Sequence, residues 1–491
     1  DNVHGNILLT EQERNLLSSR AFQRLRRIRQ LSLIHYVFPT AEHSRFVHSL
    51  GVLAIADRMA RQLHQRRPEL FTEDHIRIVR LAALLHDIGH LPFSHLGEEA
   101  YDRFIFEKNN ERGQVIREIA STHEDHLLNR LASKNVSSQR TKLHEEIGAY
   151  MVRHRDELRK VLGVEDAQVV AEVVTKSGQY PLLQAVITSA FDADRLDYLI
   201  RDSRSTGVRY GLVDAEYLIR NIDIGGENGT HVIGIRERAL PAAEHFLFAR
   251  MFHYMQVVHH RTVTTFEAVA KALIYRMIQT GCLKQIGSVA DLYDMALSEE
   301  WDTFDDEMVF ARIRDFRSDF AHLPLDHALA EAILYRRGPR ILCEMRDLTP
   351  IGGGHSEEYE GLKRLVTLHP EMIAGWLDLP PEFVSYTEVS VQLDSIETSV
   401  SEMQTKDRFG LGYEASEALR LIDDHGQAKL AVMSQDSLLG MLANYRRHTL
   451  RVFFVESERY RVREAAVRSA KERIKQLFPR AITKLGSTEI G

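Results

Sequence analysis

The chain has 491 residues, 44% of them hydrophobic and 27% charged, which is the composition of a globular protein of two or three ordinary domains or one large one. No apolar run approaches the roughly 20 residues that a membrane-spanning helix needs, and residues 1–9 lack the features of a secretory signal. The two cysteines, Cys282 and Cys343, lie far apart, which argues against a disulfide framework and favours a cytoplasmic protein. The net charge of -7 argues against nucleic acid as a partner.

Hydrophobic periodicity predicts a mainly α chain with a smaller mixed α/β region after about residue 350. In chain order we expect an amphipathic segment over 11–33, helices over 41–64, 74–88, 143–162, 166–176 and 181–203, a small hairpin around 225–235, a long helix over 239–277 and further helices over 288–348. Residues 100–140 are polar and irregular, as expected of an insertion. The end of the chain predicts strands and loops over 383–435, a strand over 450–455 and a basic helix over 461–477.

These elements predict two regions. Residues 1–350 form a helical domain, and residues 351–491 form a mixed α/β region that packs on this core and takes part in oligomer contacts.

The end of the helix expected over 74–88 carries the first chemical signal. Its almost continuous apolar run stops at His86 and Asp87, just before Gly89. Because buried charge must be paired or bound to metal, this pair is a candidate for metal ligation. Taken alone, the pair is better explained by a helix cap at His86 and the start of a loop at Asp87.

Two other segments add polar side chains with helical spacing. Arg45 and His48 are three residues apart and share a helix face. Asp194, Tyr198 and Asp202 form a single stripe, whereas Asp192 and Asp197 point elsewhere and are interpreted as solvated or capping acids. A surface charge pattern would explain this stripe as well as a binding site would.

The two histidines and two aspartates in these three segments make a mixed nitrogen and oxygen donor set. Such a set suits Fe, Mn, Zn or Co and leaves positions open for water and substrate. The absence of thiolates argues against a closed structural zinc site.

Six segments follow one another in an order that resembles a known family: 1–5, 22–26, 37–39, 45–52, 86–95 and 192–202. The chain is similar to the HD-domain deoxynucleotide triphosphohydrolases, which include bacterial dGTPase-like proteins and the vertebrate sterile-alpha-motif and HD-domain dNTPase. The resemblance covers about 1–350. It implies an HD-type helical catalytic core, a homo-oligomer, and metal-dependent hydrolysis of (deoxy)nucleoside triphosphates to nucleoside and inorganic triphosphate, with Mg²⁺ on the substrate phosphates.

The resemblance also implies roles for individual residues. The matching metal ligands are His48, His86, Asp87 and Asp194. The matching catalytic residues are His90, His95, Glu98, as the carboxylate that orients His95, and His144, for which His123 is a rival. Contacts to phosphates and sugar match Gln30, Leu31, Arg45, Arg195, Tyr198, Asp202 and Arg250. Gln23 and Arg26 match a regulatory nucleotide pocket and would bind an activator, although an ordinary amphipathic surface explains them equally well.

The sequence departs from the family at two positions. Val258 stands where the family has a tyrosine that, with Leu31, crowds the 2′ position of the sugar, so ribonucleotides are less firmly excluded. Ser18 stands where the vertebrate enzyme has an aspartate that reads guanine. Three alternatives stay open: a ribonucleotide hydrolase, a signalling-nucleotide phosphodiesterase, and a nucleotide-sensing regulatory HD module without turnover.

Overall fold

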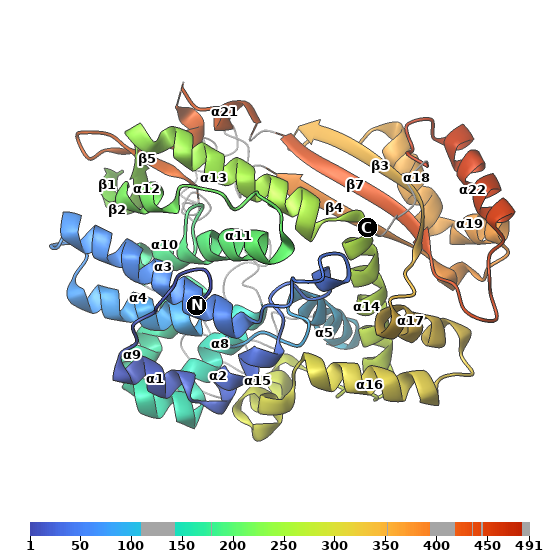
Figure 1. The fold of residues 1–491 in the computed structure, drawn as a ribbon, viewed down its shortest axis with the longest axis horizontal. Coiled ribbons are helices and arrows are strands. Elements are labelled where there is room, and N and C mark those ends of the chain that lie inside the picture. Colours follow the sequence, from blue (N-terminus) through green and yellow to red (C-terminus); the bar gives the residue numbers. More distant parts are fainter. Residues whose placement is uncertain are drawn as a thin grey trace.

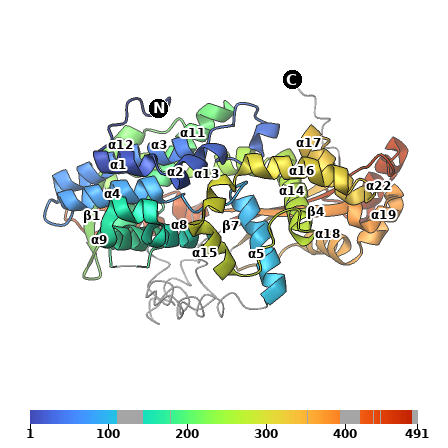
Figure 2. The same ribbon diagram turned by 90° about the horizontal axis from the view of Figure 1, so that it is seen from below.

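Helices make up most of the protein, which confirms the prediction of a mainly α fold (Figure 1). The computed structural model describes residues 1–109, 143–177, 179–350, 352–392, 418–434, 436–442 and 445–483. Helices from the N-terminal part of the chain gather at one end of the molecule, and the helices that cover the last sheet lie at the other end (Figures 1 and 2). Among the described residues, no helix combines the length and the apolar character needed to cross a bilayer.

The helical part contains the following α-helices: α1 (Glu11–Leu17), α2 (Arg20–Arg24), α3 (Arg45–Arg66), α4 (Glu73–Leu85), α5 (His95–Asn109), α8 (Leu143–His154), α9 (Asp156–Thr175), α10 (Pro181–Ile187), α11 (Ala193–Thr206), α12 (Ala215–Arg220), α13 (Leu240–His253), α14 (Arg261–Gln279), α15 (Val289–Leu297), α16 (Asp306–Asp319) and α17 (Pro324–Tyr335). Short 3-10 turns lie at Leu25–Arg27, Ile34–Tyr36, Glu237–Ala239, Glu299–Thr303, Pro381–Phe383 and Ala431–Met433.

Helix α4 lies at the centre of the helical part. Thr72 caps its N-terminus by accepting a hydrogen bond from the backbone N–H of His75, and every residue from Ile78 to Leu85 is buried. The helix packs against α3, α9 and α10, so apolar side chains on all of its faces find partners. The helix ends at Leu85, and the chain turns at His86 inside this core rather than at the surface.

Two small sheets complete the fold. Strands β1 (Ile222–Glu227), β2 (Thr230–Arg236), β5 (Arg420–Ile422) and β6 (Ala428–Leu430) form one sheet in the order β1-β2-β5-β6. Strands β3 (Arg340–Pro350), β7 (Tyr445–Phe454) and β4 (Val384–Gln392) form an antiparallel sheet in the order β3-β7-β4. Helices α18 (Glu357–Leu368), α19 (Pro370–Leu377) and α22 (Glu464–Leu477) pack on the second sheet, and a short helix α21 (Leu439–Leu442) precedes β7.

The hairpin predicted around residues 225–235 is confirmed as β1 and β2. Its turn residues Asn228 and Gly229 both have positive φ angles, of 50° and 80°. This is the turn chemistry that joins two antiparallel strands with the right-handed twist of a sheet.

The prediction of helices up to residue 348 is wrong, because residues 340–350 form strand β3. Each residue of this strand pairs with a residue of β7 that is far away in the sequence, such as Arg340 with Phe454 and Met345 with Leu450. Partners about a hundred residues away do not influence a local periodicity, so the pattern could not reveal them. Both sheets contain strands from either side of the boundary that we predict at residue 350.

The single long helix predicted over 239–277 is interrupted. Helix α13 ends at His253, a π-helical turn follows over Tyr254–Val258, and α14 starts at Arg261 after His260 accepts a hydrogen bond from Thr262. A π-helical turn brings residues into register that an α-helix would separate, and such turns occur frequently at functional sites. The apolar pattern continues through the break, which hides it from the sequence.

The prediction of an irregular stretch over 100–140 is wrong for its first part, because α5 continues as a helix to Asn109. The rest of that stretch lies outside the described residues. The same holds for 393–417 within the predicted strand-and-loop region, whose described parts contain β4, β5 and β6.

Candidate active site

The four residues predicted as metal ligands lie together. His48 comes from α3, His86 and Asp87 from the turn after α4, and Asp194 from the start of α11. Nε2 of His48 lies 3.0 Å from Oδ1 of Asp194, and Nε2 of His86 lies 4.0 Å from the same oxygen. Asp87 places Oδ1 3.3 Å from Nε2 of His86 and Oδ2 3.7 Å from Nε2 of His48.

The donor atoms of this cluster fit a divalent metal. Nε2 of His86 is buried and makes no hydrogen bond, and Nε2 of His48 is buried and faces only the carboxylate oxygens of Asp194 and Asp87. The other ring nitrogens are engaged, since Nδ1 of His86 donates to the carbonyl of Ala83 over 2.8 Å and Nδ1 of His48 lies 2.8 Å from a carboxylate oxygen. Unpartnered buried nitrogens are costly without a ligand, and a mixed nitrogen and oxygen set suits a transition metal.

The carboxyls of the cluster are held in their ionised form. Burial alone would raise the pKa of Asp194, but hydrogen bonding and charge from His48, with His86 nearby, hold that pKa below its ordinary range. Burial also disfavours ionised Asp87, and there the charges of Arg45, His86 and His90 outweigh it and lower the pKa well below the usual value. Both side chains therefore offer anionic oxygens to a cation.

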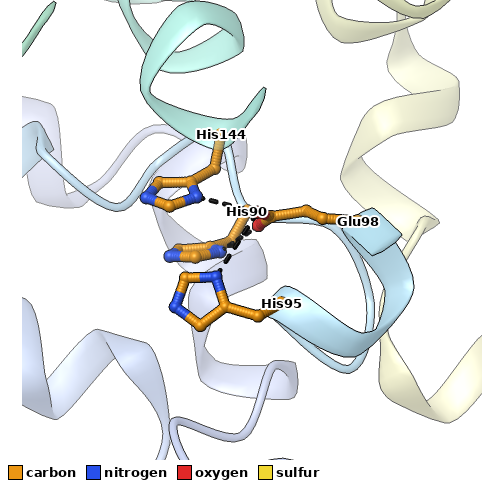
Figure 3. A group of neighbouring side chains, drawn as sticks. All are labelled: His90, His95, Glu98 and His144. Atoms are coloured by element: carbon orange, nitrogen blue, oxygen red, sulfur yellow. Dashed lines mark hydrogen bonds and ion pairs between the residues drawn. The ribbon is translucent and has the colours of Figure 1, made fainter. Parts of the chain in front are cut away.

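A second cluster consists of three histidines around one carboxylate (Figure 3). Glu98 on α5 receives the Nδ1 atoms of His90 at 2.5 Å, His144 at 2.9 Å and His95 at 3.4 Å. The rings of His90 and His144 stack with centroids 3.7 Å apart. Glu98 thus contacts not only His95, as the sequence suggests, but all three rings.

The carboxylate defines the tautomer of these histidines. An ionised carboxylate only accepts hydrogen bonds, so each Nδ1 that faces Glu98 carries the proton and each Nε2 is turned away from it. Burial would raise the pKa of Glu98, but the charges of His144 and His90 hold that pKa well below its usual range. The side chain of His95 is 57% exposed, whereas His90 and His144 are buried.

The structure brings His144 into this cluster, and its rival His123 lies outside the described residues. Close packing of two backbone segments explains the placement. A Cβ atom on Gly89 would come within 2.2 Å of the carbonyl of His144 and 2.4 Å of the backbone nitrogen of Gly148. Only glycine at position 89 lets the turn after α4 lie directly on α8.

An unusual backbone turn brings His95 back toward His90. Phe93 and Ser94 both adopt the left-handed region, with φ angles of 59° and 57°. Such conformations cost free energy and persist where the surroundings hold them, here a hydrogen bond from the backbone N–H of Phe93 to Asp306 and one from Arg45 to Oγ of Ser94.

Both clusters open into one cavity of about 200 Å³. Of the residues predicted to contact phosphates and sugar, those that line this cavity are Gln30, Leu31, Arg45, Tyr198 and Asp202. The stripe of Asp194, Tyr198 and Asp202 along α11 faces the cavity, as its spacing predicts. Arg45 also donates to Oδ2 of Asp87 over 2.6 Å, so it already contacts a predicted metal ligand.

Two residues predicted to contact the phosphates, Arg195 and Arg250, are not among those that line the cavity. Arg250 donates to the hydroxyl of Tyr198 over 3.0 Å, and Nε of Arg195 lies 3.3 Å from Oδ2 of Asp192. Val258 and Leu31, the two positions that we expect to face the sugar, both line the cavity. The π-helical turn presents Tyr254 and Val258 to the same cavity.

Gln23 and Arg26, the predicted regulatory residues, contact each other away from the cavity. Nε of Arg26 donates to Oε1 of Gln23 over 2.8 Å, and the guanidinium lies 3.6 Å above the ring of Phe46. Gln23 in turn donates to the carbonyl of Leu17 over 2.7 Å.

The interpretation of Asp197 as a solvated or capping acid is wrong. Its carboxylate is completely buried and lies 2.8 Å from Nδ1 of His48. Asp192 is a capping residue, as predicted, because it accepts a hydrogen bond from the backbone N–H of Arg195 at the start of α11. Helical spacing shows which residues share a face, but it does not show what that face meets, so Asp197 gave no separate signal.

The part of the chain that holds the four predicted ligands matches a known family model. The HD domain family model matches residues 45–202, a span that contains His48, His86, Asp87 and Asp194. An uncharacterized protein of Methanocaldococcus jannaschii, MJ1154, is 31% identical over 297 residues, or 60% of this chain and 53% of the relative. The deoxynucleoside triphosphate triphosphohydrolase SAMHD1 of Danio rerio is 29% identical over 358 residues, or 70% of this chain and 51% of the relative. The chain thus spans about half the length of these curated relatives.

Solved structures share the fold at low sequence identity. A phosphohydrolase from Bacteroides thetaiotaomicron superposes with a TM-score of 0.61 at 21% identity and covers 92% of this chain and 98% of that one. A hypothetical protein from Aquifex aeolicus gives a TM-score of 0.62 at 22% identity over 97% of this chain and 98% of its own. Residues 45–202 of the chain therefore match an HD domain, and the chain is similar to proteins named deoxynucleoside triphosphate triphosphohydrolase.

Proposed function

We propose that the protein hydrolyses deoxynucleoside triphosphates to deoxynucleoside and inorganic triphosphate. One observation carries the proposal: the predicted metal ligands and the histidine cluster open into the same cavity and touch each other, with Oδ1 of Asp87 3.1 Å from Nε2 of His90. A phosphate between the two groups would meet a cation on one side and proton-carrying imidazoles on the other. Relatives named as deoxynucleoside triphosphate triphosphohydrolases support the choice of substrate.

The metal would be held by His48, His86, Asp87 and Asp194. When bound, a divalent Fe, Mn, Zn or Co ion there would polarise a phosphoryl oxygen and stabilise the negative charge that develops on it. A second ion, Mg²⁺, would accompany the triphosphate of the substrate.

The histidines would supply proton transfer. Glu98 holds Nδ1 of each ring and Oδ1 of Asp87 faces Nε2 of His90, so Nε2 of His95 and Nε2 of His144 are left to exchange a proton with the α-phosphate and the leaving 5′-oxygen. Of the three, the side chain of His95 is the most exposed and lines the cavity, so it is the one we assign to the leaving oxygen.

The remaining lining residues would bind the substrate. Arg45 would meet the phosphates, Arg250 would hold Tyr198 against the sugar, and Asp202 would accept a hydrogen bond from the sugar hydroxyl. Nε2 of His43 lies 2.9 Å from Oδ1 of Asp202, which keeps this carboxylate in place. Arg195 would approach the phosphates after leaving Asp192.

Product analysis tests the proposal. Protein loaded with Mn²⁺ is incubated with each of the eight common nucleoside triphosphates, singly and mixed, and the products are separated by anion exchange. We expect deoxynucleoside and inorganic triphosphate. Monophosphate with pyrophosphate, or diphosphate with phosphate, would assign another phosphohydrolase activity, and tight nucleotide binding without any product would assign a sensing module.

The proposal includes a cytoplasmic homo-oligomer that an activator nucleotide regulates through Gln23 and Arg26. Arg26 is exposed and the adjoining Gln23 is half-buried, so a nucleotide or a second subunit can reach the pair from the surface. Sedimentation velocity with and without nucleotides tests this part, and an active protein that stays monomeric throughout would contradict it.

A further inference from the structure

We propose that residues 1–5 act as a positioning element for the metal site, because His4 holds Asp197 and Asp197 holds the ring of His48. This inference rests on the proposed metal site. The residues concerned do not line the cavity and would not contact the substrate. They lie behind the metal ligand His48, on the side away from the cavity.

The contacts form an unbroken chain from the N-terminal segment to the metal ligand. Nε2 of His4 lies 2.6 Å from Oδ1 of Asp197, and Oδ2 of Asp197 lies 2.8 Å from Nδ1 of His48. On the far side of the same ring, Nε2 of His48 faces Asp194 at 3.0 Å. All four side chains except Asp194 are nearly or completely buried.

The carboxylate of Asp197 determines which nitrogen of His48 can bind a metal. Arg201 donates to both oxygens of Asp197, and an arginine–carboxylate pair of this kind holds an ionised carboxylate, so the group is an acceptor only. Nδ1 of His48 must then carry a proton, which leaves Nε2, on the side of Asp194, as the nitrogen that would bind a metal. A carboxylate behind a metal-binding histidine fixes the ring orientation and makes the nitrogen more basic.

Arg201 holds Asp197 from another side. Its Nε donates to Oδ2 over 2.8 Å and its Nη2 donates to Oδ1 over 3.0 Å, which is the two-pronged geometry of a strong arginine–carboxylate pair. Both oxygens of Asp197 therefore have fixed partners, and the carboxylate cannot rotate away from His48. His4 supplies the contact that comes from outside α3 and α11.

Asp1, in the segment before His4, forms an ion pair with the same arginine, Arg201. Asp1 accepts hydrogen bonds at Oδ1 from the backbone N–H groups of Val3 and His4, and its Oδ2 lies 3.0 Å from Nη1 of Arg201. Asp1 and Asp197 thus face a single guanidinium.

Helix α3 is shaped to leave room for these groups. A Cβ atom on Gly51, one turn after His48, would lie 2.0 Å from Oδ1 of Asp197 and 2.3 Å from Nη2 of Arg201. No side chain fits there while the carboxylate and the guanidinium stay in place, so Gly51 is matched to the contact between Asp197 and His48.

The test measures metal affinity and metal-induced stabilisation in the full chain. We compare His4→Phe, which keeps the ring volume without a donor, His4→Gln, which keeps a donor, and Asp197→Asn. The matched control is His64→Phe at the other end of α3, where Nδ1 of His64 lies 2.7 Å from the carbonyl of Phe71 and has no contact with His48. For each protein, Mn²⁺ affinity is measured by chelator competition, and Tm is measured without and with saturating Mn²⁺.

We expect His4→Phe and Asp197→Asn to weaken Mn²⁺ binding by about 10- to 100-fold, the range seen when a partner behind a metal ligand is removed. The rise in Tm on adding Mn²⁺ should shrink in both, His4→Gln should recover part of it, and His64→Phe should match the native protein. A purely structural role would lower both Tm values equally and leave their difference and the affinity unchanged, which would overturn the inference. Native protein that takes up no Mn²⁺ at all would instead refute the metal site itself.

Discussion

Oδ1 of Asp87 lies 3.3 Å from Nε2 of His86 and 3.1 Å from Nε2 of His90. One oxygen of one carboxylate thus borders both the predicted metal ligands and the histidines around Glu98. Asp87 is buried and its other oxygen accepts a hydrogen bond from Arg45 over 2.6 Å, so both oxygens of this carboxylate have close polar neighbours. The two clusters meet at Asp87, and each can be tested by its own substitutions.

Replacing His86 and Asp87 together by alanine should remove the metal and leave the fold intact. The two side chains lie at the end of α4 rather than within its apolar face, so α4 keeps its packing. Activity should fall on the order of 10²-fold or more, because a catalytic metal supplies several kcal/mol of charge stabilisation. Elemental analysis and circular dichroism check the prediction, and a variant that retains a full equivalent of metal would refute the ligand assignment.

Glu98→Gln should lower kcat by about 10²-fold while the metal content stays the same, since loss of general acid–base catalysis costs at least that much. A glutamine amide offers one acceptor and one donor group, so it cannot receive the Nδ1 protons of three rings. The adjacent Glu99 provides a matched control, because it is exposed and pairs with Lys271 outside the cavity. Glu99→Gln should behave as the native protein; equal losses in the two variants would show that general disturbance of α5, and not the histidine cluster, causes the effect.

Val258 predicts weak discrimination between deoxyribose and ribose. Leu31 and Val258 both line the cavity, and valine reaches less far than the tyrosine expected in the family. An apolar pocket rejects an added hydroxyl by only about 10²-fold or less. We therefore expect measurable ribonucleotide hydrolysis, and a stronger deoxyribose preference in Val258→Tyr.

The ratio of kcat/KM for dATP and ATP, and for dGTP and GTP, in the two proteins measures this effect. Complete rejection of ribonucleotides by the native protein, together with an unchanged ratio in Val258→Tyr, would place the wall elsewhere. Tyr254, which shares the π-helical turn with Val258 and also lines the cavity, would then be the residue to replace.

Glu267, which lines the cavity from α14, should make stability depend on pH. Burial raises the pKa of its carboxyl to about 7; Lys271 opposes this shift and Glu99 adds to it. Between the ordinary pKa of about 4.5 and about 7, the unfolded chain releases this proton before the folded one does. The contribution of Glu267 to the free energy of unfolding therefore falls as pH rises through this range.

Urea unfolding of the native protein and Glu267→Gln at several pH values tests the sign. The variant lacks the ionisation, so it should gain stability relative to the native protein from about pH 4.5 to 7 and hold that advantage above this range. Glu371→Gln, at an exposed carboxyl on α19, should show no such trend. A constant difference between Glu267→Gln and the native protein at all pH values would mean that Glu267 titrates normally.

Local sequence determined the parts of this protein that depend on neighbours along the chain. The apolar run of α4 is long enough to predict a helix that is buried on all faces. Because His86 and Asp87 follow directly after this run, the sequence alone predicts that two polar side chains lie inside the core. The spacing of Asp194, Tyr198 and Asp202 places three side chains on one face of α11, and the turn residues Asn228 and Gly229 specify a hairpin. Each of these follows from backbone geometry over a few residues.

Tertiary structure decided what those faces meet. His144 joins the histidine cluster because Gly89 and Gly148 let two backbones touch, and Asp197 becomes a partner of His48 because α11 lies against α3. Strand β3 exists through its pairing with β7, about a hundred residues away, and the π-helical turn at Tyr254–Val258 interrupts an apolar pattern that continues across it. Hydrogen bonds between distant segments and the close approach of backbones leave no periodic trace in either partner alone, so only the folded chain shows them.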